Sequence, residues 1–224
     1  MEIDFGSEDI RRMPVYLLLD VSGSMNGAPI QAVEQGVQLL HDSLLNQPQA
    51  VELAYLSVIT FASKAQQIIP LTPLLQFTPP SLSAGGATAL GGALHTLGEA
   101  LDNEIIQNSA ERKGDYKPLI FLLTDGEPTD TWQPEVEALK ARDQKKVGNI
   151  IALGCGGAVN TDILKQVTPQ VLLIEDVTPD NLRAFFKWVS ASVTTASQGV
   201  AAAPAGEENR LQLPPPPSGF EVIL

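Results

Sequence analysis

Apolar residues occur along the chain in two patterns: short continuous runs, and longer stretches in which they recur every three or four positions. Continuous apolar runs suit strands that are covered on both faces, as in a parallel sheet. The wider spacing marks one face of a helix. Six segments predict strands, the third of them an edge strand: Val15–Leu19, Val51–Phe61, Gln66–Leu71, Leu119–Leu123, Ile150–Leu153 and Val171–Ile174.

The helical spacing falls between these predicted strands. Proline suits the first turn of a helix because the N–H that it lacks would have no partner there. Thr178, directly before Pro179, predicts an N-cap. The predicted helices begin near Pro29, Leu90, Pro134, Thr161 and Pro179. This alternation predicts an α/β fold with a doubly wound, mostly parallel sheet and helices on both faces.

Both patterns end near Ser197, where alanine and proline become frequent. We therefore expect an N-terminal lead at 1–12, one domain at 13–196 and an Ala/Pro-rich tail at 197–224. The run Pro214–Pro217 indicates a stiff spacer. The last apolar residues of the tail are expected to dock on an apolar groove, of this chain or another: Phe220, Val222, Ile223 and Leu224.

Composition narrows the classes of function. The 224 residues are 44% hydrophobic, which is enough for the core of one domain. The net charge of −12 argues against unspecific binding to nucleic acid or to an anionic membrane, because both need a basic face. The single cysteine, Cys155, excludes an intrachain disulfide. The start is acidic where a signal peptide is basic, and no apolar run approaches the ~18 residues that cross a bilayer, so we expect a cytoplasmic location.

Oxygen-bearing side chains follow two of the predicted strands. Asp-Val-Ser-Gly-Ser at 20–24 comes after the first strand, Asp125 ends another, and Thr88 follows a Gly-Gly pair. In an open parallel sheet, ligands bind at the carboxyl ends of the strands. Carboxylates and hydroxyls without thiolate or imidazole favour a hard divalent ion such as Mg²⁺ or Mn²⁺. Neutral hydroxyl ligands would leave much of the ion's charge unneutralised, so a carboxylate from outside could complete its shell.

In this pattern the chain resembles the von Willebrand factor A domains, whose metal-ion-dependent adhesion site is Asp-x-Ser-x-Ser followed by a distant Thr and a distant Asp. The resemblance covers roughly residues 12–196. It implies a six-stranded, doubly wound sheet with one antiparallel edge strand, in which the strands ending at Asp20 and Asp125 are neighbours. The positions that match the metal site are Asp20, Ser22, Ser24, Thr88 and Asp125.

The resemblance also implies a function. Domains of this family bind a divalent cation and, through it, an acidic residue of a protein partner, without catalysis. The chain is most similar to the TerY-type proteins of bacterial tellurium-resistance operons. That similarity implies a tellurium-resistance or stress-response system, with phosphorylation-related or other operon-encoded partners.

Two other interpretations stay open at this point. Asp and Ser after a strand, and Thr at a helix start, commonly cap the following helix. The main enzyme alternative is a Mg²⁺-dependent phosphatase with Asp20 as nucleophile and an acidic metal loop formed by Asp125 and Asp130. The motif of that enzyme class resembles Asp-x-Asp, in which the second Asp protonates the leaving group. This chain has Ser22 at that position, and serine cannot act as this acid at neutral pH. We therefore expect an interaction module and not an enzyme.

Overall fold

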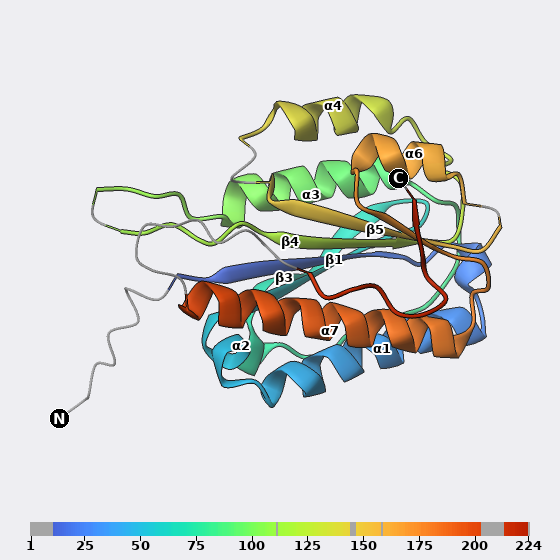
Figure 1. Ribbon diagram of the computed structural model, residues 1–224. Helices are drawn as coiled ribbons and strands as arrows, with labels where there is room; N and C mark the ends of the chain where they lie inside the picture. Colours follow the sequence, from blue (N-terminus) through green and yellow to red (C-terminus); the bar gives the residue numbers. More distant parts are fainter. Residues whose placement is uncertain (1–10, 111, 144–146, 158, 203–212, 224) are drawn as a thin grey trace.

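The computed structural model describes residues 11–110, 112–143, 147–157, 159–202 and 213–223, which form one mixed sheet between two layers of helices (Figure 1). The sheet has seven strands in the order β3-β2-β1-β4-β5-β6-β7. The strands from β2 to β6 in this order pair in parallel, whereas β3 and β7 are antiparallel edges. The predicted doubly wound α/β class is confirmed, with one strand and one antiparallel edge more than expected.

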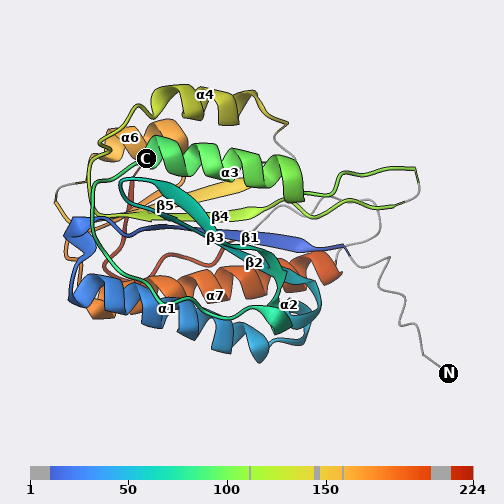
Figure 2. The ribbon, with the colours of Figure 1, turned by 180° about the vertical axis from the view of Figure 1, so that it is seen from behind.

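The strands are β1 (Met13–Asp20), β2 (Ala54–Phe61), β3 (Ala65–Pro73), β4 (Leu119–Thr124), β5 (Asn149–Cys155), β6 (Val171–Ile174) and β7 (Glu221–Ile223). The helices are α1 (Ala28–Leu45), α2 (Pro48–Leu53), α3 (Leu90–Glu104), α4 (Gln133–Ala141), α6 (Thr161–Val167) and α7 (Pro179–Ala202). Helices α1, α2 and α7 cover one face of the sheet, and α3, α4 and α6 cover the other (Figures 1 and 2). None of the described helices is both long and apolar enough to cross a membrane.

The central strands supply side chains to both helix layers, which explains their continuous apolar runs. Along β1, Leu17 and Leu19 belong to the core under α1 and α7, whereas Leu18 belongs to the core under α3. Each such buried side chain contributes about 1.5–3 kcal/mol. Gly36 lets α1 approach α7 closely, because a Cβ there would overlap the ring of Phe186. The resulting rigid layers fix the position of the loops at the sheet edge.

The predicted strand Val51–Phe61 is wrong at its start. Residues up to Leu53 form the short helix α2, and β2 begins at Ala54. Pro48 opens this helix, and it buries Ala50 and Leu53 on one face. Val51-Glu52-Leu53 is too short to show a helical period, and its apolar–polar–apolar alternation also suits a strand.

The C-terminal segment docks on its own chain. Helix α7 continues to Ala202, so the expected boundary at 196 divides a helix. After the helix, the described segment 213–223 returns to the body: the indole N–H of Trp188 donates to the carbonyl of Pro214 at 2.9 Å, and Phe220 packs on the α1/α7 core. The antiparallel pairing of β7 with β6 follows. Of the apolar residues expected to dock, Val222 is 50% exposed, contrary to the expectation, and Leu224 lies outside the described residues.

Removing residues 213–224 should therefore weaken the domain and expose the edge of β6. We expect a loss of about 2–3 kcal/mol in the free energy of unfolding, from the buried apolar area and one hydrogen bond. The free edge should also promote self-association. Denaturant titration followed by tryptophan fluorescence, together with size-exclusion chromatography, measures both effects. Val222→Ser is the matched control, because this side chain is 50% exposed; an unchanged midpoint and elution for the deletion would contradict the docking.

Candidate metal site

The site lies at the carboxyl edge of the two central strands. Asp20 is the last residue of β1, and Asp125 directly follows β4. These strands are adjacent and parallel, with Leu19 opposite Leu123, so both carboxylates leave the sheet at the same level. The expectation that these two strands are neighbours is thereby confirmed. Their junction is also the point where the strand order reverses, which in open α/β sheets is the usual place for a ligand.

Hydrogen bonds join the two carboxylates through the serines of the turn at 20–24. The backbone N–H of Ser22 donates to Oδ1 of Asp20 at 2.8 Å. The hydroxyls of Ser22 and Ser24 are 3.0 Å apart, and Ser24 Oγ donates to Oδ1 of Asp125 at 2.7 Å. Ser24 is exposed, whereas Ser22 is buried. Four of the five predicted ligands therefore form one connected cluster that reaches the surface at Ser24.

The fifth predicted residue, Thr88, lies over the turn that follows β4. A Cβ built on Gly126 would be 3.5 Å from Oγ1 of Thr88, which places this hydroxyl beside the residue that follows Asp125. Thr88 is only 6% exposed, although it belongs to a loop. The structure thus brings all five predicted residues to the same edge of the sheet.

Glycine backbone holds the Thr88 loop against the serine turn. The N–H of Gly23 donates to the carbonyl of Gly86 at 3.0 Å, and the N–H of Gly85 donates to the carbonyl of Val21 at 2.8 Å. Gly86 has a φ of +84°, a conformation that L-residues with a Cβ rarely adopt. The Gly-Gly pair therefore serves a close approach of two loops, and the positive φ explains why glycine stands there.

Burial makes the two carboxylates costly to ionise in the metal-free protein. Asp20 is 0% exposed and Asp125 is 7% exposed. Burial raises the pKa of Asp20, and hydrogen bonds from Ser22 and Thr124 partly oppose the rise. Burial also raises the pKa of Asp125, to which the nearby charge of Asp20 adds. Neither carboxylate pairs with a lysine or arginine of the described residues, so a divalent cation would supply the missing positive charge.

The donor set fits a hard cation. Among the residues that the structure describes, no three His, Cys, Asp or Glu side chains come together as a metal site. At this edge the structure brings together hydroxyl oxygens and two carboxylates, a donor set that suits a hard divalent cation. Burial and the charges of Asp125 and Asp20 raise the pKa of the nearby Cys155 thiol, which keeps it protonated and unsuited to ligation.

The sequence did not predict two supporting residues, Thr124 and Thr129, and a third, Asp130, has another role than the phosphatase alternative requires. Thr124 donates its hydroxyl to Oδ2 of Asp20 at 2.6 Å, and Thr129 bonds the backbone of Thr88. Asp130, which the phosphatase alternative needed as part of an acidic metal loop, accepts hydrogen bonds from two backbone N–H groups at the start of α3. Its position five residues after Asp125 gave no indication of this capping role.

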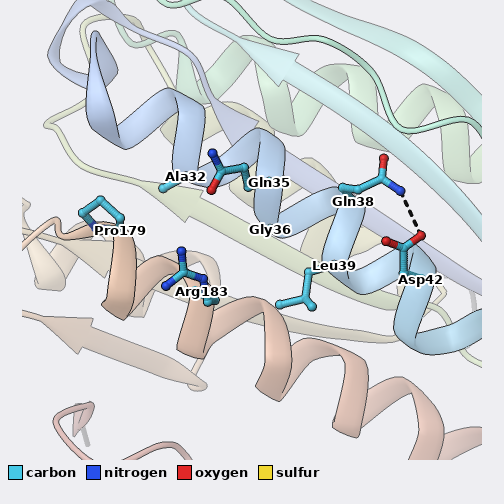
Figure 3. A pocket seen from close by; sticks show the side chains of 8 residues that line it. All are labelled: Ala32, Gln35, Gly36, Gln38, Leu39, Asp42, Pro179 and Arg183. Carbon is cyan, nitrogen blue, oxygen red and sulfur yellow. Dashed lines mark hydrogen bonds between the residues drawn. The ribbon is translucent and has the colours of Figure 1, made fainter.

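A shallow pocket of about 260 Å³ lies between α1 and α7, away from this edge (Figure 3). None of the five predicted ligands lines it. Its charged side chains already have partners: Asp42 accepts from Gln38 at 2.9 Å, and Arg183 donates to Asp180 at 2.7 Å. The pocket is therefore separate from the cluster of carboxylates and hydroxyls.

The family model of the von Willebrand factor type A domain matches residues 15–186, and the chain belongs to this family. Domains of the family are commonly metal-dependent protein-interaction modules and are typically not enzymes. An uncharacterized protein of Synechocystis sp. is 30% identical over 166 residues, which are 70% of this chain and 36% of that relative. The chain thus spans about a third of that relative's length.

Solved structures share the fold at low identity. The von Willebrand factor type A protein from Catenulispora acidiphila is 21% identical with a TM-score of 0.59, over 83% of this chain and 43% of that one. Proximal thread matrix protein 1 from the mussel byssus, with a zinc-occupied metal-ion-dependent adhesion site, is 21% identical with a TM-score of 0.56, over 82% and 48%. The pilus adhesin SpaC from Lactobacillus rhamnosus GG is 16% identical with a TM-score of 0.64, over 84% and 31%.

Proposed function

We propose that this chain binds one divalent cation, Mg²⁺ or Mn²⁺, and through it a carboxylate of a protein partner. The observation that carries the proposal is the connected cluster of hydroxyls and buried carboxylates at the edge of β1 and β4, which no lysine or arginine of the described residues neutralises. The proposed metal-binding residues are Asp20, Ser22, Ser24, Thr88 and Asp125.

The hydroxyls of Ser22, Ser24 and Thr88 are the proposed oxygen ligands. A hydroxyl can donate one hydrogen bond and still offer lone pairs to a cation. Ser24 can therefore keep its bond to Asp125 while it ligates the ion. Asp20 and Asp125 would bind the ion directly or hold its waters, and in the second case they would orient the hydroxyls.

The proposed contact with a partner's carboxylate follows from the charge of the bound ion. When the two aspartates hold waters, the ligands that touch the ion are neutral and its positive charge stays largely unbalanced. Mg²⁺ usually keeps several waters, and an anionic oxygen from a partner can replace one of them. The exposed Ser24 marks the side from which this oxygen would arrive. Such a site needs no nucleophile, and we propose a binding module and not an enzyme.

One relative with the same fold carries zinc at its metal-ion-dependent adhesion site. Our choice of Mg²⁺ or Mn²⁺ rests on the oxygen-only donor set of this chain. A partner from a tellurium-resistance or stress-response system, including a phosphorylation-related one, stays a prediction from the resemblance of the sequence.

A pull-down from native lysate, run in Mg²⁺ and again with a chelator, tests the proposal. We expect a partner that is retained in Mg²⁺ and released by the chelator, and that Asp20→Ala bait fails to retain in either condition. Asp42→Ala bait is the control, because Asp42 is an exposed acid on α1 whose carboxylate accepts a hydrogen bond from Gln38, away from the proposed metal site. The same set of retained proteins in Mg²⁺ and in chelator would contradict a metal-dependent module.

A further inference from the structure

We propose that Thr129 and Asp130 position Thr88 for the metal, although neither is a ligand. The inference rests on the proposed metal site and assigns to it two residues outside the predicted ligand set. Both belong to the segment that links Asp125 to α4, far along the chain from Thr88.

Thr129 holds the backbone of Thr88 at both its polar groups. The N–H of Thr129 donates to the carbonyl of Thr88 at 2.9 Å. In return, the N–H of Thr88 donates to Oγ1 of Thr129 at 3.1 Å. With its N–H and carbonyl both bonded to one residue, the Thr88 backbone has little freedom to rotate, and this fixes the direction of its Cα–Cβ bond, from which the hydroxyl extends.

Asp130 holds the helix that follows Thr88. Its Oδ1 accepts from the N–H of Gly91 at 3.0 Å, and its Oδ2 accepts from the N–H of Gly92 at 2.9 Å. These N–H groups belong to the first turn of α3, where a helix has no partners of its own. Ala89, at the N-cap position, provides no side-chain acceptor. A carboxylate from a distant segment therefore caps α3 and also complements its dipole.

The glycine at the start of α3 allows this contact. A Cβ at Gly91 would lie 2.5 Å from the carbonyl oxygen of Thr131 and 2.9 Å from Oδ2 of Asp130. Any side chain at position 91 would therefore push the two segments apart. The close approach, the two-sided bond to Thr88 and the cap together form a clamp, defined here as Thr129 and Asp130.

The clamp joins two loops that the sheet alone does not place relative to each other. Asp125 is fixed by β4, whereas Thr88 lies in a connection between β3 and α3. Because the clamp segment continues from Asp125, it ties the Thr88 hydroxyl to the strand that carries Asp125. Outer residues that orient metal ligands typically contribute 10–100-fold to metal affinity.

The test is Mn²⁺ affinity, measured by calorimetry on the full chain. We expect Asp130→Ala to lower the affinity about 10–100-fold, and Thr129→Val to lower it through the lost hydroxyl acceptor. Asp130→Asn keeps one acceptor oxygen and should recover part of the loss. The matched control is Thr178→Ala, which removes the bond from the N–H of Asn181 at the start of α7 and should leave Mn²⁺ affinity unchanged.

A double variant separates positioning from stability. In Thr88→Ala the hydroxyl is absent, so adding Asp130→Ala should cost clearly less than it does in the wild type. Full additivity, or wild-type affinity in a folded Asp130→Ala protein, would overturn the positioning role. If Asp130→Ala does not fold, Thr129→Val decides by the same cycle. If the wild type binds no Mn²⁺, the proposed function is overturned. If the wild type binds Mn²⁺ and the clamp variants bind it equally well, this inference alone is overturned.

Discussion

Asp20→Asn should abolish the response of the protein to Mn²⁺ and leave the metal-free protein at least as stable as the wild type. Asparagine keeps an oxygen for the N–H of Ser22, and its amide can donate to the hydroxyl of Thr124, so the hydrogen bonds with these two groups have a substitute. The substitution removes a fully buried charge whose ionisation burial disfavours. If Asp20 only stabilised the fold, its replacement would instead lower the stability of the metal-free protein.

Thermal unfolding with and without Mn²⁺ measures both effects. An ion at 100 times its dissociation constant stabilises the folded state by about 2.7 kcal/mol. For a chain of this length that corresponds to a rise in Tm of about 5–10 °C. We expect this rise in the wild type and in the control Asp42→Asn, and none in Asp20→Asn. A Tm that rises equally in Asp20→Asn would remove Asp20 from the site.

The pH dependence has a definite sign. The folded-state pKa values of Asp20 and Asp125 are raised above their usual range. The folded, metal-free protein therefore binds more protons than the unfolded chain, and its stability falls as the pH rises from the usual carboxyl range through the raised values. Unfolding in chelator across this pH range should show a smaller fall for Asp20→Asn than for the wild type. An equal fall in both proteins would contradict the assignment to Asp20.

Thr88→Ala should lower the affinity for the protein partner about 10–100-fold in Mg²⁺ and scarcely at all in chelator. The substitution removes one neutral hydroxyl without changing the formal charge, so a loss that depends on the metal isolates the ligand role. Titration of the partner identified by pull-down measures both affinities. Thr72→Ala is the control, since the hydroxyl of Thr72 donates to the carbonyl of Pro70 in its own strand.

The partner's acidic residue can be joined to Thr88 in a double-mutant cycle. If the ion bridges the two residues, the effects of Thr88→Ala and of replacing that acid on the affinity should be strongly non-additive in Mg²⁺. A charge-assisted contact in a partly desolvated cleft can be worth several kcal/mol, against about 1 kcal/mol or less for a rim charge. Simple additivity would mean that the ion supports the loops and does not contact the partner.

Most of the fold could be predicted because its signals are local. The runs that became β1 and β4 are apolar at every position, since both faces of these strands are covered. A polar residue at the end of each run marks the edge of the sheet. These run ends mark where Asp20 and Asp125 leave the sheet, whereas the expectation that their strands are neighbours came from the resemblance to von Willebrand factor A domains.

The features that escaped prediction depend on tertiary contacts. Strand β7 has three residues and pairs with β6 at the end of a segment that also bonds Trp188 through the carbonyl of Pro214. Asp130 has the sequence context of an acidic metal loop, and only the approach of α3 shows that its oxygens are used as a cap. No spacing along the chain encodes either contact.

Anomalous diffraction from crystals grown with Mn²⁺ tests the central claim most directly. The account predicts one strong anomalous peak at the edge between β1 and β4, within coordination distance of the hydroxyls of Ser22, Ser24 and Thr88, and no such peak in crystals of Asp20→Asn. A peak elsewhere on the molecule, or a peak at this edge that persists in Asp20→Asn, would contradict it.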